Sequence, residues 1–265
     1  MQQTFAELRK KRECGLVCYI MAGYPDSRSS IRIADSLIRG GADAIEIGIP
    51  FSDPVADGPT IQKASTASLQ AGMTPSKALG IARSIRSAHA RTPLLAMTYS
   101  NIILRNGISS FLHSAKLCGI DGFVIPDLPV EEAGEFIDES KIKNLDTVFL
   151  ASPNTPKERI ERIAGKTTGF LYLVSVYGTT GSRAQFEQYS ADAIASAKAA
   201  VAGKVPVAVG FGISRPAHVK FMKDAGADAV IVGSAIVDII TRRKKMEDGL
   251  RELESFARRL KRACR

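Results

Sequence analysis

The chain has 265 residues, of which 45% are hydrophobic and 24% charged, and its formal net charge is +9. These fractions are ordinary for a globular protein and exclude a disordered, collagen-like or coiled-coil chain. Apolar runs stay short of the roughly 18 residues that suggest a membrane span. The first twelve residues also lack the apolar core of a signal peptide, so the sequence predicts a cytoplasmic protein without membrane attachment.

Short apolar segments alternate with segments of helical periodicity along the whole chain. The predicted strands are 16–21, 44–48, 94–97, 122–125, 147–150, 170–175, 205–209 and 229–232. Such alternation is typical of a parallel sheet whose strands are buried on both faces. Eight units favour an α/β fold of one domain, a TIM (β/α)8 barrel over residues 1–265. An open, doubly wound sheet is the alternative.

A recurring pattern supports repeated strand and helix units. Segments 41–45, 119–123 and 226–230 each read glycine, a small or apolar residue, aspartate and then apolar strand residues. Glycine suits the end of a helix because it adopts the left-handed conformation there. The pattern precedes the second, fourth and eighth predicted strands.

The positive charge is concentrated near the C-terminus. Residues 241–265 hold ten Lys or Arg and four Asp or Glu, a net charge of +6. Leu250, Leu253, Phe256 and Leu260 recur three and four positions apart. This spacing predicts a C-terminal basic amphipathic helix with a solvated charged face. The alternative is a patch that binds a polyanion such as nucleic acid.

Cysteine and histidine give no sign of a metal or disulfide framework. The four cysteines lie at positions 14, 18, 118 and 264, too sparse for a disulfide scaffold and without a C-x-x-C pair. The three histidines are scattered, so no metal site is predicted.

The predicted strand 44–48 carries an acidic residue between small ones. Strand alternation places Ile45 and Ile47 on one face, and Ala44, Glu46 and Gly48 on the other. Two isoleucines suit the outer face against helices, which directs Glu46 into the barrel. Burial raises the pKa of such a carboxyl group and suits a general acid–base residue. The alternative is a structural, ion-paired glutamate.

The loop after this strand is stiff and acidic. Residues 49–60 contain three prolines, a serine and two aspartates. Barrel enzymes carry their chemistry at the carboxyl ends of strands, which makes Asp57 a candidate functional residue. Its position before Gly58 and Pro59 also suits a helix N-cap.

Later strand ends supply an aromatic residue and glycine-rich loops. Tyr172 shares its strand face with Phe170 and Val174, and could be ordinary core. The loop 177–183 is rich in glycine and hydroxyl residues and can close over a ligand. Gly-x-Gly at 210–212 and the pair Gly233-Ser234 predict a phosphate site, because glycines let backbone N–H groups approach an anion. Tight turns are the alternative.

Four of these segments resemble one enzyme family. Segment 46–62 (EIGIPFSDPVADGPTIQ) is similar to the signature of the tryptophan synthase α subunit, and 126–132, 210–214 and 233–237 resemble further family segments in the same order. The resemblance spans nearly the whole chain. It implies a TIM barrel that cleaves indole-3-glycerol phosphate to indole and glyceraldehyde 3-phosphate.

The resemblance also implies roles for single residues. Catalytic residues would be Glu46, Asp57 and Tyr172. The substrate phosphate would be bound by Gly181, Gly212, Gly233 and Ser234. The indole pocket would be lined by Tyr19, Met97, Val124, Leu150 and Thr180. The chain itself would need no cofactor. Its partner would be a tryptophan synthase β subunit that carries pyridoxal phosphate, in an α2β2 complex that passes indole between subunits.

One position departs from many bacterial relatives. Val176 stands where many relatives have an arginine, which affects closure of the loop rather than the chemical step.

Other functions are alternatives to this lyase activity. No lysine lies in a predicted strand to form a Schiff base, and two carboxylates suffice for the cleavage. The alternatives are a free-standing indole-releasing lyase, another phosphate-binding barrel such as a sugar-phosphate isomerase, and a non-catalytic regulatory or nucleic-acid-binding module.

Overall fold

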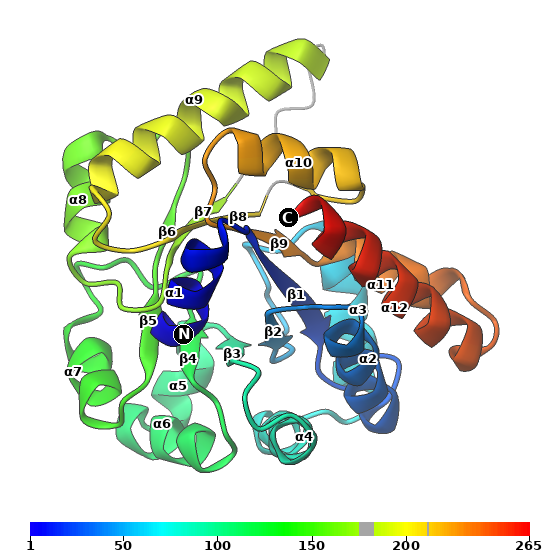
Figure 1. Cartoon of the computed structure of the whole chain (residues 1–265). Coiled ribbons are helices and arrows are strands. Elements are labelled where there is room, and N and C mark those ends of the chain that lie inside the picture. The colour runs from blue at the N-terminus through cyan, green and yellow to red at the C-terminus, as the bar shows by residue number, and fades with distance from the viewer. Residues whose placement is uncertain (175–182, 211) are drawn as a thin grey trace.

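The computed structural model describes residues 1–174, 183–210 and 212–265, with residues 183–186 as backbone only. In these ranges helices surround one parallel sheet (Figure 1). Its strand order is β5-β4-β3-β2-β1-β9-β8-β7-β6. β5 and β6 are consecutive parts of one chain segment, separated only by Phe149, so the two ends of the order meet. The sheet is therefore a barrel, which confirms the predicted fold and excludes an open sheet.

The elements follow the predicted alternation. The strands are β1 (Gly15–Met21), β2 (Ala44–Gly48), β3 (Leu94–Met97), β4 (Gly122–Val124), β5 (Asp146–Val148), β6 (Leu150–Ala151), β7 (Leu171–Val174), β8 (Val207–Gly210) and β9 (Ala229–Val232). The helices are α1 (Gln2–Lys11), α2 (Ser27–Arg39), α3 (Pro59–Gln70), α4 (Pro75–Ala88), α5 (Ser100–Asn106), α6 (Ile108–Leu117), α7 (Gly134–Ile142), α8 (Lys157–Ala164), α9 (Arg183–Val201), α10 (Pro216–Asp224), α11 (Ser234–Arg242) and α12 (Met246–Ala263).

The predicted bounds match three strands, differ by one residue at one or both ends in three others, and differ more in the remaining two. The predicted strand 147–150 is divided at Phe149, because its first part pairs with β4 and its second part with β7. The predicted strand 205–209 begins only at Val207. Pro206 precedes it and has no N–H to donate to a neighbouring strand, although its carbonyl accepts from the N–H of Leu171 at 2.8 Å.

Strand alternation divides the hydrophobic residues into two layers. Ile45, Ile47, Leu171 and Leu173 belong to the outer layer, between the sheet and the helices. The barrel interior holds a separate cluster, and α1 adds Phe5 and Leu8 to it at the amino ends of the strands. The interior residues are Val17, Ala44, Leu95, Val124, Val148, Phe170, Ala208, Ala229 and Ile231. Glu46 alternates with the outer isoleucines and so points inward, as predicted.

The repeated aspartates join neighbouring strands at the amino-terminal end of the barrel. Each aspartate forms two hydrogen bonds with one partner residue near the start of a neighbouring strand. The backbone N–H of the aspartate donates to the carbonyl of the partner at 2.8 Å, and the carboxylate of the aspartate accepts the backbone N–H of the partner at 2.7 or 2.8 Å. The pairs are Asp43 with Leu16, Asp121 with Leu94, and Asp228 with Val207. A basic side chain binds each carboxylate: Lys261, Arg86 and Lys198 respectively.

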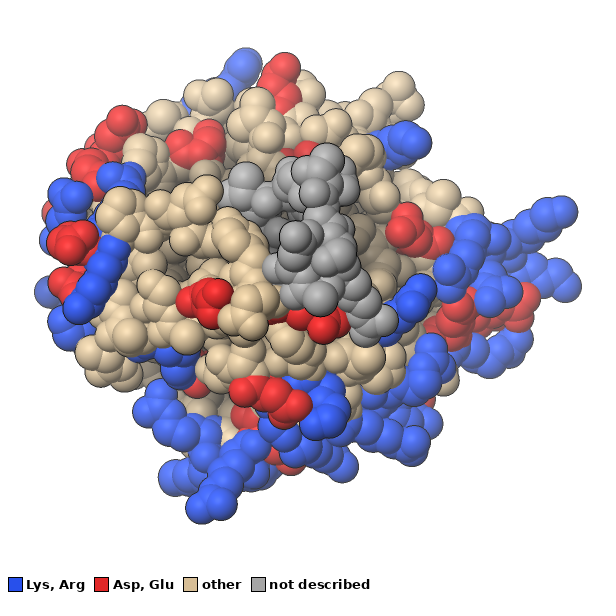
Figure 2. All heavy atoms as spheres, turned by 90° about the horizontal axis from the view of Figure 1, so that it is seen from above, with Lys and Arg blue, Asp and Glu red and all other residues tan. Residues whose placement is uncertain are grey.

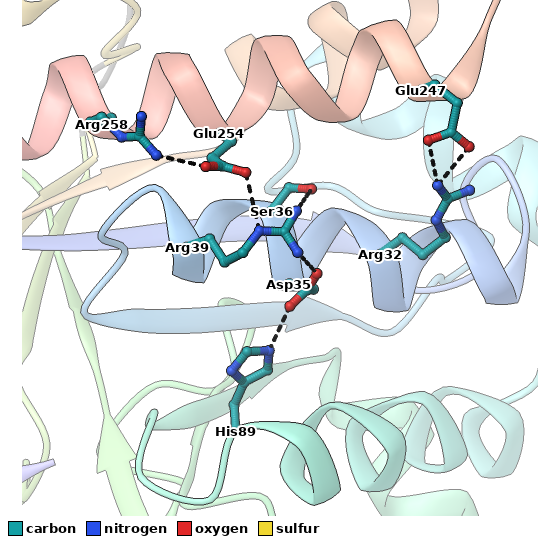
Figure 3. Close-up of polar contacts among 8 residues, drawn as sticks. All are labelled: Arg32, Asp35, Ser36, Arg39, His89, Glu247, Glu254 and Arg258. Atoms are coloured by element: carbon teal, nitrogen blue, oxygen red, sulfur yellow. Dashed lines mark hydrogen bonds and ion pairs between the residues drawn. The ribbon is translucent and has the colours of Figure 1, made fainter.

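The basic tail forms the predicted amphipathic helix. α12 packs against α2 and buries Leu250, Leu253, Phe256 and Leu260. Figure 3 shows how acidic residues of α12 reach arginines of α2: Glu247 binds Arg32, and Glu254 binds Arg39. Each acidic residue of segment 241–265 is ion-paired with arginine; these are Glu247, Asp248, Glu252 and Glu254.

Charge is unevenly spread over the surface seen from above in Figure 2. Lys and Arg gather toward the lower and right-hand edges, with acidic side chains among them, whereas uncharged residues cover much of the central area. Among the described residues, every helix is too short or too polar to cross a membrane.

Candidate active site

A cavity of about 590 Å³ opens at the carboxyl ends of the barrel strands. The site residues predicted from the sequence that line it are Tyr19, Glu46, Asp57, Met97, Val124, Leu150, Tyr172, Gly212, Gly233 and Ser234. Thr180 and Gly181 lie outside the described residues. The structure therefore brings residues from distant parts of the sequence into one space of a size typical for small-molecule sites.

Glu46 is the most unusual group in this cavity. It lies on β2 with an exposed fraction of 0%, and neither carboxylate oxygen has a hydrogen-bond partner among the described residues. Burial, and secondarily the nearby charge of Asp57, raises the pKa of Glu46 to about 8. A structural glutamate would be ion-paired or hydrogen-bonded, so that alternative does not describe Glu46.

Asp57 faces Glu46 from the loop that follows β2. Its backbone N–H donates to the carbonyl of Pro54 at 3.0 Å, and its own carbonyl accepts from Gln62 Nε2 at 2.8 Å. Burial raises the pKa of Asp57 to about 6, and a hydrogen bond from Tyr99 partly offsets this rise. Gly58 rather than Asp57 is the N-cap of α3, so the helix-cap interpretation of Asp57 is wrong.

Sequence reasoning missed Tyr99, which touches the loop of Asp57. Tyr99 follows β3 and is 3% exposed. Its hydroxyl oxygen accepts the backbone N–H of Ala56 at 3.1 Å, and its ring stacks on Phe51 with centroids 5.1 Å apart. The signal that could have found it is position, since it stands two residues after the end of β3, where barrel enzymes carry their functional groups.

Two further tyrosines enter the cavity because glycines make room for them. A Cβ atom at Gly48 would lie 2.0 Å from the Tyr19 hydroxyl, and one at Gly210 would lie 2.8 Å from the Tyr172 hydroxyl. Tyr19 pairs with Glu46 across the β1–β2 ladder. Burial, with the nearby carboxylates, holds the pKa of both tyrosines well above the usual range. They are therefore neutral hydrogen-bond donors at neutral pH.

Another part of the cavity wall, after β8 and β9, is suited to an anion. Gly233 is the N-cap of α11, whose first residue is Ser234, and a helix N-terminus carries partial positive charge. Gly212 adopts the left-handed conformation, with φ of 61°, which glycine permits at low cost. The wall also contains Thr60, Ile61, Pro126, Val174, Gly210, Ile213 and Ile231, of which the sequence analysis had indicated Gly210 as part of Gly-x-Gly.

A metal site is not evident in the part of the chain that the structure describes. No group of three or more His, Cys, Asp or Glu side chains there is arranged to hold an ion. All four cysteines are free thiols and are buried. The polar side chains that line the cavity are the carboxyl groups of Glu46 and Asp57, the phenols of Tyr19 and Tyr172, and the hydroxyls of Thr60 and Ser234.

Comparison with known proteins decides between the remaining functions. The sequence model of the family described as tryptophan synthase alpha chain matches residues 5–265. The chain belongs to the tryptophan synthase alpha chain family. A curated alpha chain from Methanosarcina barkeri is 42% identical over 261 residues, covering 98% of this chain and 95% of the relative. One from Rippkaea orientalis is 40% identical and covers 100% of this chain and 98% of the relative.

Solved structures agree with the family assignment. A tryptophan synthase structure from M. tuberculosis superposes with a TM-score of 0.88 at 31% identity, covering 100% of this chain and 98% of that one. The tryptophan synthase alpha-subunit of Pyrococcus furiosus gives a TM-score of 0.85 at 42% identity, covering 94% and 98%. As a tryptophan synthase alpha chain, the protein is a carbon–carbon lyase that cleaves indole-3-glycerol phosphate. The resemblance seen in the sequence is confirmed, and the sugar-phosphate isomerase alternative is excluded.

Proposed function

We propose that Glu46 and Asp57 carry out the proton chemistry of the cleavage, one on each side of the bound indole ring. The observation that carries the proposal is the Glu46 carboxyl group, fully buried in the same cavity as Asp57 and without a hydrogen-bond partner among the described residues. The pKa of Glu46 is about 8 and that of Asp57 about 6. At neutral pH Glu46 is therefore mostly protonated and can act as an acid, whereas Asp57 is mostly ionised.

In this mechanism the indole leaves as a carbon acid. Asp57, ionised, accepts a hydrogen bond from the ring N–H and stabilises the positive charge that develops there. Glu46, protonated, transfers its proton to C3 of the ring, which becomes the electron sink. The carbon–carbon bond then breaks, and Glu46 takes the proton of the glycerol hydroxyl as that carbon becomes an aldehyde. Each positioned proton transfer contributes about 10²–10⁴-fold to the rate.

Tyr172 and the glycine-rich wall hold the two ends of the substrate in this proposal. The Tyr172 phenol, neutral and buried, is a donor beside the carboxylates. Gly212, Gly233 and Ser234 bind the phosphate through backbone N–H groups and a hydroxyl, helped by the dipole of α11. Gly181 completes this site, and Thr180 helps to position Asp57. Tyr19, Met97, Val124 and Leu150 surround the indole ring, which their mostly apolar surfaces suit.

The reaction needs no cofactor in this chain, because two carboxylates supply both proton transfers. Its partner in the proposal is the pyridoxal phosphate-bearing β subunit, in an α2β2 complex in the cytoplasm. Indole is apolar and leaks away in free solution, so direct transfer to a subunit that consumes it is advantageous. The proline-stiffened loop 49–60 and the loop after β7 are expected to face this subunit. Partner binding would then be coupled to the placement of Asp57.

The test is indole release from indole-3-glycerol phosphate, with and without a β subunit. Glu46→Gln and Asp57→Asn should each abolish turnover while substrate still binds, and Glu132→Gln, an exposed control, should behave like the wild type. Gly233→Asp should weaken substrate binding, since its carboxylate fills the cradle and repels phosphate. A near-normal rate for either carboxylate variant refutes the assignment. Equal activity with and without the β subunit indicates a free-standing lyase instead.

A further inference from the structure

We infer that Tyr99 is a positioning residue that sets the place and charge of Asp57, and that Asp127 acts through it from a third loop. The inference rests on the proposed role of Asp57 and extends it. It concerns three loops, which follow β2, β3 and β4 at the carboxyl end of the barrel.

The Tyr99 side chain contacts the loop after β2 at three points. Its ring stacks on Phe51 at an interplanar angle of 25°. Its hydroxyl accepts the N–H of Ala56 at 3.1 Å and forms a hydrogen bond with the Asp57 carboxylate. A backbone N–H can only donate, so the Tyr99 oxygen is the acceptor toward Ala56 and its own proton is available to donate to the Asp57 carboxylate.

Tyr99 is in turn fixed by the residue that follows it. The Ser100 N–H donates to one oxygen of Asp127 at 2.9 Å, and the Ser100 hydroxyl donates to the other at 2.7 Å. These bonds cap the start of α5, whose N-cap is Tyr99 itself and lacks a side-chain cap. Asp127 therefore anchors the backbone at Tyr99 to the loop after β4, and a displaced Tyr99 would move its hydroxyl away from Asp57.

The charged and titratable groups facing Asp57 come from several elements. Glu46 approaches from β2, Tyr19 from β1 and Tyr172 from β7, and each is electrostatically linked to Asp57. Tyr99 differs from them because its hydrogen bond favours the ionised form of Asp57. Loss of this bond raises the pKa of Asp57, so the acidic limb of the pH–rate profile moves to higher pH.

The experiment compares Tyr99→Phe, Asp127→Ala and the control Tyr189→Phe, which removes an exposed phenol bonded to Asn154. Indole release is measured across pH 5 to 9, together with Tm. Tyr99→Phe keeps the ring on Phe51, so Tm should stay within about 3 °C. We expect kcat to fall about tenfold or more, KM to change less than about threefold, and the acidic limb to rise by about half a pH unit.

Asp127→Ala should shift kcat and the acidic limb in the same direction but less far, with a lower Tm because a helix cap is lost. The control should match the wild type in all measurements. A Tyr99→Phe protein with unchanged kcat and acidic limb overturns the inference. An Asp127→Ala protein that loses only stability reduces Asp127 to a helix cap and overturns that part. If Asp57→Asn itself retains activity, the proposed role of Asp57 is refuted. If Asp57→Asn is inactive and Tyr99→Phe is unchanged, only the inference about Tyr99 is refuted.

Discussion

Replacing Glu46 by glutamine removes a titratable group that folding transfers from water to a fully buried position. In the unfolded chain Glu46 releases its proton near pH 4.5, whereas in the folded protein its pKa is about 8. The stability that this group contributes is fully present below pH 4.5 and is lost as the pH rises to 8, because the unfolded chain ionises first. Glutamine does not titrate, so the unfolding free energy of the variant does not fall over this pH range on account of residue 46.

The magnitude follows from the size of the shift. Each pH unit between the two pKa values costs about 1.4 kcal/mol of unfolding free energy. Between pH 5 and pH 8 the variant should therefore gain about 4 kcal/mol relative to the wild type. For a chain of this length about 2–4 °C of Tm corresponds to 1 kcal/mol, so the Tm difference should grow by about 10 °C over this range.

The assay is thermal unfolding of both proteins at a series of pH values, with Glu132→Gln as the exposed control. The control should follow the wild-type curve throughout, since Glu132 is exposed in the folded protein and folding does not transfer it out of water. Glu46→Gln should also be inactive, so stability and activity should move in opposite directions. A Tm difference that is the same at pH 5 and pH 8 would show that folding does not change the pKa of Glu46, and the reasoning would fail.

Three further outcomes follow from the contacts. Gly48→Ala should raise KM and cost about 1–3 kcal/mol of unfolding free energy, measured by denaturant titration, because its Cβ would meet the Tyr19 hydroxyl at 2.0 Å. Lys261→Met should cost about 3 kcal/mol in the same titration, with KM unchanged, since it leaves the Asp43 carboxylate, bound at 2.8 Å, without its cation. The four buried thiols should react with a thiol reagent only after unfolding, which a timed colorimetric titration checks.

The fold was largely predictable because its signals are local. Alternation of apolar segments located every strand, and the three- and four-residue spacing located α12. The break at Phe149 was not predictable, because it depends on which neighbours each half of the strand meets when the sheet closes. The function of the repeated aspartates was equally hidden, since their backbone partners lie in a different strand.

The site was predictable where one residue carries the signal. Strand alternation directed Glu46 inward, and the glycines at strand ends that the sequence singled out line the same cavity. Tyr99 carried only its position after a strand end. Its contacts with Ala56 and Asp57, which lie more than forty positions earlier, arise only when the barrel forms. The wrong expectation, a cap at Asp57, used a local rule that Gly58 also satisfies.

Glu46 at the carboxyl end of the barrel differs from three aspartates at the amino end in the partners that the fold supplies to it. At the amino end, Asp43, Asp121 and Asp228 each receive a backbone N–H and a basic side chain. The same chain thus satisfies a partly buried carboxylate three times with one arrangement. At the carboxyl end, Glu46 receives neither from the described residues, although its burial is complete. A carboxylate left without partners destabilises the fold, and its retention is explained when a bound substrate supplies the missing hydrogen-bond partners.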